Sequence, residues 1–192
     1  NQTISANFAA RQIEIPFFGL YGACSTMAES LILASVLIDG EYAQHVMAAV
    51  SSHHDTAERQ FRFPTELGTQ RPLTAQWTVT GAGAMVLSKG EKGPRVTGAT
   101  VGKVVDLGIK DQNDLGSAMA PAAADTIIRH FQDTNTTPDD FDLIVTGDLA
   151  SIGKTLTQQL IEKDGYKLGD RYSDCGILIF DPAQDTHAGG SG

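Results

Sequence analysis

Apolar side chains recur every three to four positions in four stretches of the chain, and this spacing predicts helices. The stretch at 25–38 is followed by Gly40, a residue type that commonly ends a helix. Its apolar face carries Met27, Leu31, Ala34 and Ile38, with few charges elsewhere, so we expect it to be central and buried. The four expected helices are a short one before Gln12 and three longer ones at 25–38, 117–133 and 151–163.

Short apolar or alternating runs lie between these helices and predict strands. We expect the run at 95–107 to pair with the one before it through a Lys-Gly-Glu-Lys-Gly-Pro turn. Alternation of strands with helices is typical of a mostly parallel sheet covered by helices, so the predicted fold class is α/β. The expected strands are 17–21, 45–50, 76–87, 95–107, 142–145 and 175–180.

Two β-α-β patterns divide the chain near Gly90 and suggest two halves, residues 1–90 and 91–192. The first half is interrupted at 51–75, where histidines, arginines, aromatic residues and two prolines break the periodicity. This segment is predicted to be a loop-rich insertion, and it holds most of the local positive charge.

Charge and cysteine usage narrow the classes of function. The 192 residues carry a formal net charge of -9, which argues against a nucleic-acid groove and against electrostatic binding to anionic lipid. Two cysteines 151 positions apart fit a reducing compartment better than a disulfide scaffold. No long apolar span is present in the sequence, so any membrane association is expected to be peripheral.

Cys24 is the most informative single residue, because it stands between the apolar run 17–21 and the expected helix at 25–38. The positive end of that helix is expected to lower the pKa of the thiol and favour the thiolate, which makes Cys24 a nucleophile or a ligand contact. A small, buried, unreactive cysteine is the alternative reading. These residues alone leave both open.

Three other motifs resemble known binding sites but lack a required feature. Residues 147–155 follow a strand and open a helix, but the spacing between their glycines is one residue too long for a phosphate loop. Gly81-Ala-Gly83 lacks the third glycine of a dinucleotide fingerprint. His53-His54-Asp55, taken with Glu58, has no second cluster to complete a tetrahedral metal site. We therefore expect neither a metal nor a cofactor.

The cysteine elbow, the glycine-rich strand at 78–83 and the strand-loop-helix at 143–156 resemble the thiolase and ketoacyl synthase superfamily over most of the chain. Longer strings are similar to the stage V sporulation protein AD family. They are Tyr21-Gly-Ala-Cys-Ser-Thr26, Ser51-Ser-His-His54, Gln60-Phe-Arg-Phe-Pro64, Gln76-Trp-Thr-Val-Thr-Gly-Ala-Gly83 and Asp185-Thr-His-Ala-Gly-Gly-Ser-Gly192.

This resemblance implies a layered α-β-α-β-α thiolase-like fold, here without its first and last strands, as though processed or excised. It implies non-catalytic binding of dipicolinic acid (pyridine-2,6-dicarboxylate), alone or as its calcium chelate, for uptake into the developing bacterial spore. It further implies a homodimer, peripheral at the spore inner membrane, with other stage V sporulation proteins providing the membrane passage.

Condensing enzymes of the superfamily use a cysteine as acyl acceptor, with a histidine and a second histidine or asparagine that stabilise the oxyanion. By the resemblance, Cys24 matches the acyl acceptor. The histidine loop falls at Val145-Thr146-Gly147-Asp148, which has no imidazole, and Asp174 stands where the asparagine is expected. An ionised carboxylate cannot donate a hydrogen bond, so we expect Gly147, Asp148 and Asp174 to mark degenerate catalytic positions.

If the cavity persists without catalysis, backbone and side-chain donors are expected to hold the dicarboxylate. Arg62 offers the strongest contact, through bidentate pairing with a carboxylate. The competing hypothesis is acyl transfer at Cys24 with His53 or His187 as an unusual base, and a purely structural scaffold is a third. The candidate ligand-binding residues are Cys24, Ser25, Ser52, His53, Arg62 and Gln76.

Overall fold

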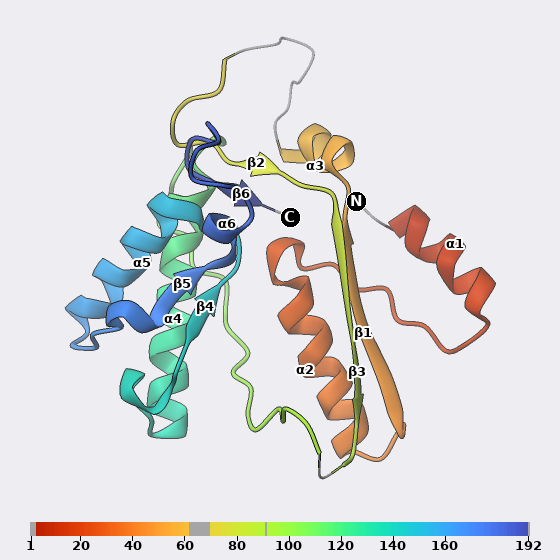
Figure 1. The fold of residues 1–192 in the computed structure, drawn as a ribbon. Coiled ribbons are helices and arrows are strands. Elements are labelled where there is room, and N and C mark those ends of the chain that lie inside the picture. The colour runs from red at the N-terminus through yellow and green to blue at the C-terminus, as the bar shows by residue number, and fades with distance from the viewer. Residues whose placement is uncertain (1–2, 62–69, 91, 192) are drawn as a thin grey trace.

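Helices and short strands alternate along residues 3–61, 70–90 and 92–191, which are the residues that the computed structural model describes (Figure 1). We call the described residues up to Gly90 the amino-terminal half and those from Lys92 onward the carboxy-terminal half. In chain order the elements are α1 (Thr3–Ile13), η1 (Ala23–Ser25), α2 (Thr26–Asp39), β1 (His45–Ser52), α3 (His54–Phe61), β2 (Trp77–Thr78), β3 (Gly81–Ser88), α4 (Leu115–Thr134), η3 (Pro138–Asp140), β4 (Ile144–Thr146), α5 (Ala150–Lys163), η4 (Gly169–Arg171), β5 (Tyr172–Asp174), α6 (Cys175–Leu178) and β6 (Gly190–Ser191).

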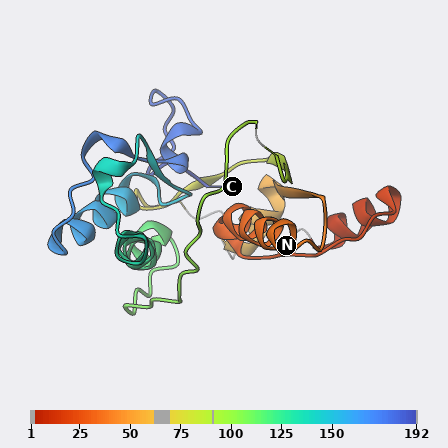
Figure 2. The ribbon, with the colours of Figure 1, turned by 90° about the horizontal axis from the view of Figure 1, so that it is seen from below.

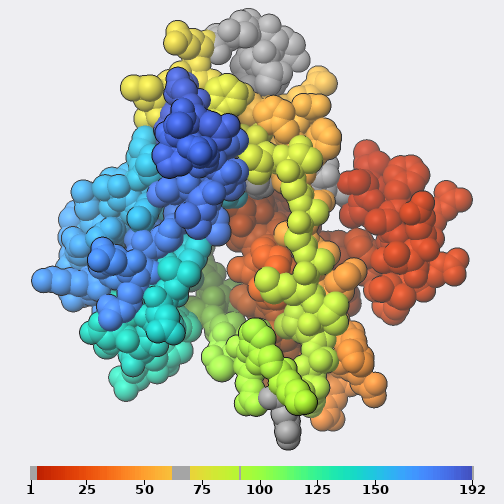
Figure 3. Space-filling model, in the orientation of Figure 1, coloured from red at the N-terminus to blue at the C-terminus, as the bar shows by residue number. Residues whose placement is uncertain are grey.

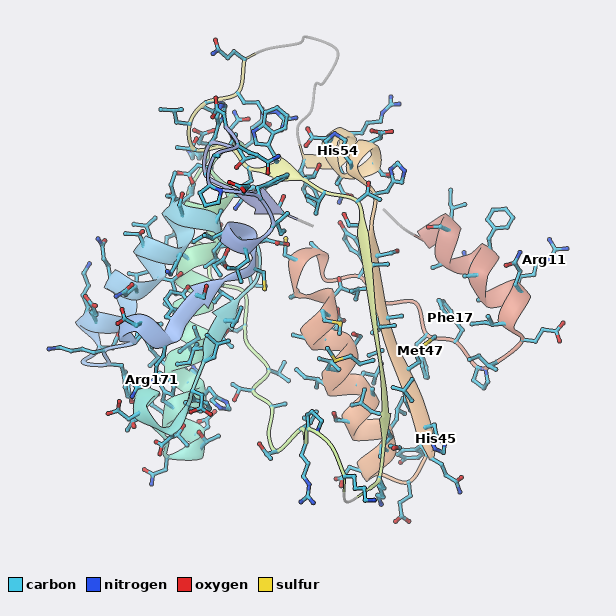
Figure 4. The ribbon with its side chains drawn as sticks, in the orientation of Figure 1. Arg11, Phe17, His45, Met47, His54 and Arg171 are labelled. Carbon is cyan, nitrogen blue, oxygen red and sulfur yellow. The ribbon has the colours of Figure 1, made fainter. Side chains whose placement is uncertain are left out.

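The amino-terminal half is built on the antiparallel pair β1 and β3, in which His45 faces Ser88 and Ser52 faces Gly81. Helix α2 packs along both strands. The buried apolar residues here are mostly small, such as Ala34 on α2 and Ala48 on β1. Helix α1 stands apart from the other elements in the views of Figures 1, 2 and 3, and its Arg11 points away from them in Figure 4.

The carboxy-terminal half contains a β-α-β unit, in which the parallel strands β4 and β5 are linked through α5. Helix α4 packs closely on α5 where Gly116 meets Gly153. A Cβ built on Gly153 would lie 2.8 Å from the carbonyl oxygen of Gly116, so the two backbones touch at a point where no larger residue fits. The hydrophobic core of this half consists of Ala124, Phe131, Ile161, Leu168 and Tyr172.

Two connections join the halves. Strand β6, near the end of the described chain, pairs in parallel with β2 of the amino-terminal half, so that Trp77 faces Gly190. The segment 92–111 runs between the halves and contacts α4, with Thr100 hydrogen-bonded to His130 at 2.9 Å and Lys103 paired with Asp125 at 3.3 Å. None of the helices within the described ranges is long and apolar enough to cross a membrane.

The helices follow the sequence pattern closely. The expected helices at 25–38, 117–133 and 151–163 correspond to α2, α4 and α5, and each differs by no more than two residues at either end. Side chains define their ends: the Asp114 carboxylate accepts from Ser117 N at 3.0 Å at the start of α4, and Asn135 closes that helix in the left-handed conformation, with φ of 54°.

The strand predictions are less accurate, and three of them are wrong. Residues 17–21 and 95–107 form no regular strand, and β3 pairs with β1 rather than with 95–107. Residues 175–178 form helix α6, because Asp174 accepts from Gly176 N at 2.9 Å and caps a helical turn directly after the short strand β5. The insertion at 51–75 also contains a regular element, α3.

Candidate functional site

Cys24 lies in the single turn η1, immediately before α2. The preceding residue, Ala23, has φ of 48°, a left-handed conformation that costs energy for a residue with a side chain. Neighbouring side chains hold this turn: Thr26 Oγ1 accepts from Gly22 N at 3.0 Å, and Ser25 Oγ donates to Gly22 O at 2.7 Å. Local hydrogen bonds therefore fix the strained elbow that presents the thiol.

The loop between β4 and α5 meets Cys24 from the other half of the chain. A Cβ built on Gly147 would lie 3.8 Å from the carbonyl oxygen of Cys24. The next residue, Asp148, is buried, has φ of 60° and hydrogen-bonds to the Cys24 thiol through its side chain. The chain thus brings together two residues that are 124 positions apart in the sequence.

Burial raises the pKa of the Cys24 thiol from 9.0 to about 12, and the charge of Asp148 and its hydrogen bond to the thiol act in the same direction. A bond from the backbone N–H of Cys24 opposes the shift, and the charge of Asp174 adds to it. The thiol is therefore protonated at neutral pH. Of the two readings that the sequence left open, the raised pKa favours the unreactive thiol over the thiolate, because burial and nearby carboxylates outweigh the helix end.

Asp174 is completely buried and accepts four hydrogen bonds. The donors are Thr146 Oγ1 at 2.7 Å, Leu149 N at 3.1 Å, Ala150 N at 2.8 Å and Gly176 N at 2.9 Å. Two of these donors lie at the start of α5, where a bound phosphate would be expected in a phosphate loop. The protein's own carboxylate already occupies that position, which agrees with the judgement that residues 147–155 do not bind nucleotide.

Gln76 links the halves at the same place. It precedes β2, only 1% of its surface is exposed, and its Nε2 donates to the carbonyl oxygen of Asp148 at 2.6 Å. Its role in the structure is to support the loop that carries Asp148. Direct contact between Gln76 and a ligand stays a prediction.

A polar cluster lies behind Gln76 and consists of residues from α3, β2 and the segment before β2. Arg71 binds Glu58, donates to Gln76 O at 3.4 Å and lies over the Trp77 ring at 3.8 Å. Thr78 Oγ1 donates to Glu58 at 2.7 Å. Arg71 therefore combines a largely buried ion pair with a cation–π contact, and both fix the start of β2.

His54 joins this cluster from the first turn of α3 (Figure 4). Its Nδ1 lies 2.9 Å from the carbonyl oxygen of Thr78, which can only accept, so Nδ1 carries the proton. The neighbouring His53 is exposed. His187, the other proposed base, contacts Pro72 O through Nδ1 at 3.1 Å and packs edge-on against Trp77.

The remaining predicted ligand residues do not all gather around Cys24. Ser25 uses its hydroxyl on Gly22 O, as described above, and Ser52 donates to Val79 O at 3.0 Å, beside the polar cluster. Arg62 falls outside the described residues. Within the described ranges, no group of three or more His, Cys, Asp or Glu side chains is arranged to hold a metal ion. The sequence offered Glu58 only as a possible metal ligand and Arg71 only as part of the local positive charge of residues 51–75, because a charged residue in a loop-rich segment gives no signal of burial.

The second cysteine, Cys175, begins α6 and is exposed. Partial burial and the charges of Asp174 and Asp148 raise its pKa as well. Both cysteines are free thiols. Cys175 therefore shares the charges of Asp148 and Asp174 with Cys24, but it is more exposed.

Comparisons with known proteins agree with the resemblance in the sequence. A model of the family described as stage V sporulation protein AD matches residues 1–192. The stage V sporulation protein AD of Bacillus subtilis (strain 168) is 55% identical over 192 residues, which are 100% of this chain and 57% of that protein. The chain therefore spans less than two thirds of the length of this relative.

The fold is similar to that of a solved thiolase-like enzyme, AbyA1, a tetronic acid condensing enzyme. The TM-score is 0.56 at 15% sequence identity, and the match covers 97% of this chain and 60% of that one. At this identity the likeness shows the fold alone.

Proposed function

Because the chain belongs to the stage V sporulation protein AD family, we propose that it binds dipicolinic acid, without catalysis, for uptake into the developing bacterial spore. One arrangement carries the non-catalytic part: the Cys24 thiol lies against the buried carboxyl group of Asp148, and burial together with that charge raises the pKa of the thiol. The thiolate, not the thiol, is the nucleophilic form of cysteine. A site built this way favours recognition over attack on a thioester.

Acyl transfer at Cys24 is the competing function, and the surroundings of the thiol oppose it. Forming a thiolate beside Asp148 places two negative charges at hydrogen-bond distance, which raises the energy of the attacking species. An acyl intermediate also needs hydrogen-bond donors around its oxyanion, and an ionised carboxylate only accepts. The two bases considered for this reaction are either exposed, as His53 is, or in contact with Pro72 and Trp77, as His187 is.

The charge of the site favours the calcium chelate of dipicolinic acid over the free dianion. Asp148 and Asp174 place two carboxyl groups close to Cys24, and both contribute to the raised pKa of its thiol. A free dianion entering beside them meets like charge in a poorly solvated place, whereas a chelated calcium ion offsets the charge of the ligand. In this proposal Arg62 and backbone N–H groups near Ser25 contact the carboxylates of the ligand.

The oligomeric state, membrane location and partners of the protein are part of the same proposal. The chain acts as a homodimer, peripheral at the spore inner membrane, and other stage V sporulation proteins provide the passage through the membrane. Exposed apolar side chains of α1 and the segment after it support an interface with another protein surface, since Phe8, Phe17 and Phe18 are 63%, 44% and 65% exposed.

Calorimetric titration tests the binding function. Dipicolinate is titrated, with and without equimolar calcium, into this chain and into the full-length Bacillus subtilis relative. We expect saturable binding that is stronger with calcium; Asp148→Asn should weaken binding of the chelate, but not of the free dianion, at least severalfold, and Arg62→Ala should weaken both. Asp139→Asn removes a surface carboxylate paired with Arg171 and serves as the matched control, with binding unchanged.

The same titrations separate the alternatives. Stronger binding of the free dianion than of the chelate overturns the charge argument but keeps the binding function. Heat signals that do not saturate for either protein, with either form of the ligand, overturn the binding function itself.

A further inference from the structure

The Asp148 carboxyl group reaches Cys24 only because its own backbone is held in an unfavourable conformation. Asp148 has φ of 60° and Ala150 has φ of 54°, two left-handed residues within three positions of a loop without glycine between them. Such a conformation persists when surrounding contacts determine it. From the carboxy-terminal half, Asp174 supplies two of these contacts by accepting from Leu149 N and Ala150 N.

The contact that holds the carbonyl group of Asp148 comes from the amino-terminal half, through Gln76. Its Nε2 donates to the carbonyl oxygen of Asp148 at 2.6 Å, and both residues are buried, so water does not readily replace this hydrogen bond. The bond orients the peptide group that carries Asp148 and therefore the direction in which its side chain leaves the backbone.

The residues directly before and after Gln76 are themselves held by backbone hydrogen bonds. Ala188 N donates to Ala75 O at 3.1 Å, and Trp77 N donates to Gly189 O at 2.9 Å, so the two residues just before β6 fix the backbone on either side of Gln76. Arg71 donates to the carbonyl oxygen of Gln76 at 3.4 Å, and Glu58 anchors Arg71 in turn. A continuous set of contacts therefore runs from α3 to Asp148.

We propose that Gln76 is a positioning residue of the site: by holding the carbonyl group of Asp148, it keeps the Asp148 carboxyl against Cys24 and so controls the reactivity of the thiol. The inference rests on the geometry of buried groups and holds whatever ligand the site binds. It assigns to Gln76 an effect on Cys24 that is transmitted through Asp148 rather than through direct contact.

Alkylation of the two cysteines measures this effect without any ligand. Wild type and Gln76→Met are treated with iodoacetamide from pH 8 to pH 11, and peptide mass spectrometry follows Cys24 and Cys175 separately. In Gln76→Met we expect Cys24 to react severalfold faster at pH 9, because a displaced carboxylate no longer opposes the thiolate. Gln158→Met, which removes an amide that bonds to Glu162 on α5, is the matched control and leaves Cys24 unchanged.

A double variant decides whether Asp148 transmits the effect. Asp148→Asn alone should also accelerate alkylation of Cys24, and adding Gln76→Met to it should produce no further increase. If the two substitutions accelerate alkylation of Cys24 independently, so that their effects multiply in the double variant, the proposal is contradicted. Gln76 would then act on Cys24 without Asp148. A Gln76→Met protein that unfolds at lower temperature but retains the wild-type pH profile of Cys24 also overturns it, since that result describes a merely structural residue.

Arg71→Lys keeps the proposal testable if Gln76→Met does not fold. Lysine keeps the positive charge beside Glu58 but loses the planar group that lies over Trp77 and reaches Gln76 O. A smaller acceleration in the same direction supports the proposal, and a Cys24 pH profile identical to wild type in a folded Arg71→Lys protein contradicts it.

Discussion

The two halves of the chain bury their apolar side chains very differently. In the carboxy-terminal half, Phe131, Ile161, Leu168 and Tyr172 are at most 3% exposed and pack into one cluster. In the amino-terminal half, Met47, Met85 and Val86 on the β1–β3 pair are 52%, 54% and 69% exposed. The carboxy-terminal half therefore has a core of large side chains, whereas the amino-terminal half buries mostly alanine and leaves apolar surface on its strand pair that a partner can cover.

This contrast indicates which contacts determine the site. The Cys24 elbow belongs to the half with little core, while Asp148 and Asp174 belong to the half with a dense one. Strand β6 and Gln76 tie the first half to the second, so the geometry around the thiol depends on the carboxy-terminal half. We therefore expect substitutions in the carboxy-terminal half to lower the stability of the protein more than comparable substitutions in the amino-terminal half.

Asp174→Ala should lower the free energy of unfolding the most. It removes the acceptor of four hydrogen bonds and leaves three buried backbone N–H groups unsatisfied, for an expected loss of about 4 kcal/mol in the free energy of unfolding. Urea unfolding followed by circular dichroism measures it. Asp114→Ala, which removes the single cap of α4, is the control at about 1 kcal/mol. Equal losses in the two variants would show that Asp174 does not organise this loop.

Ile161→Ala and Ile4→Ala apply the same chemical change to a helix in each half. Ile161 is fully buried and Ile4 is 73% exposed, so we expect losses of about 3 kcal/mol and under about 0.5 kcal/mol. Chemical denaturation of both variants gives the two values. A loss at Ile4 as large as that at Ile161 would mean that α1 is buried in solution and that the contrast between the halves fails.

Gly153→Ala and Gly83→Ala test backbone packing in the same way. The added Cβ at Gly153 meets the Gly116 backbone at 2.8 Å, while that at Gly83 meets no atom within 4 Å among the described residues. We expect a loss of about 2 kcal/mol for Gly153→Ala and no loss for Gly83→Ala. Thermal unfolding separates them, and an unchanged Gly153→Ala protein would show that α4 and α5 do not pack this closely.

The pH dependence of stability gives the smallest effect. Because the folded pKa of Cys24 is about 12 and its ordinary value is 9.0, the unfolded chain loses this proton first as the pH rises. The contribution of Cys24 to the free energy of unfolding is therefore complete below pH 9 and is lost as the pH rises through 12. At pH 10 the loss is about 1 kcal/mol.

Cys24→Ala removes this loss, so its stability should fall less than that of wild type between pH 8 and pH 10. Parallel urea titrations at the two pH values measure the difference. Cys175→Ala should change the slope less, because Cys175 is exposed. Identical slopes for wild type and Cys24→Ala would contradict a half-buried Cys24 with a raised pKa.

The sequence predicts helices well and strands poorly here, for a physical reason. Helices α2, α4 and α5 make their hydrogen bonds within one segment, so periodicity and capping residues are enough to locate them. A strand needs a second segment, and an apolar run such as 17–21 or 175–180 does not show whether that segment lies beside it. Residues 175–178 became a helix through one local cap, Asp174.

The site was likewise only partly predictable from the sequence. The sequence and the family resemblance singled out Cys24, Asp148 and Asp174, and the structure brings these three residues together. The sequence left the protonation state of the thiol open, because that state depends on burial and on a carboxyl group 124 positions away. The support from Gln76, Arg71 and Glu58 was equally invisible, since it depends on how β2 lies against β6.

Acylation of Cys24 is the most direct test of the claim that this site recognises a ligand and does not attack a thioester. The chain and the full-length Bacillus subtilis relative are incubated with acetyl coenzyme A at pH 8 and analysed by intact-mass and peptide mass spectrometry. We expect no acetyl group on Cys24 during a period in which a small free thiol is fully acetylated. Accumulation of an acetyl group on Cys24 of either protein would contradict the account and favour the condensing-enzyme function.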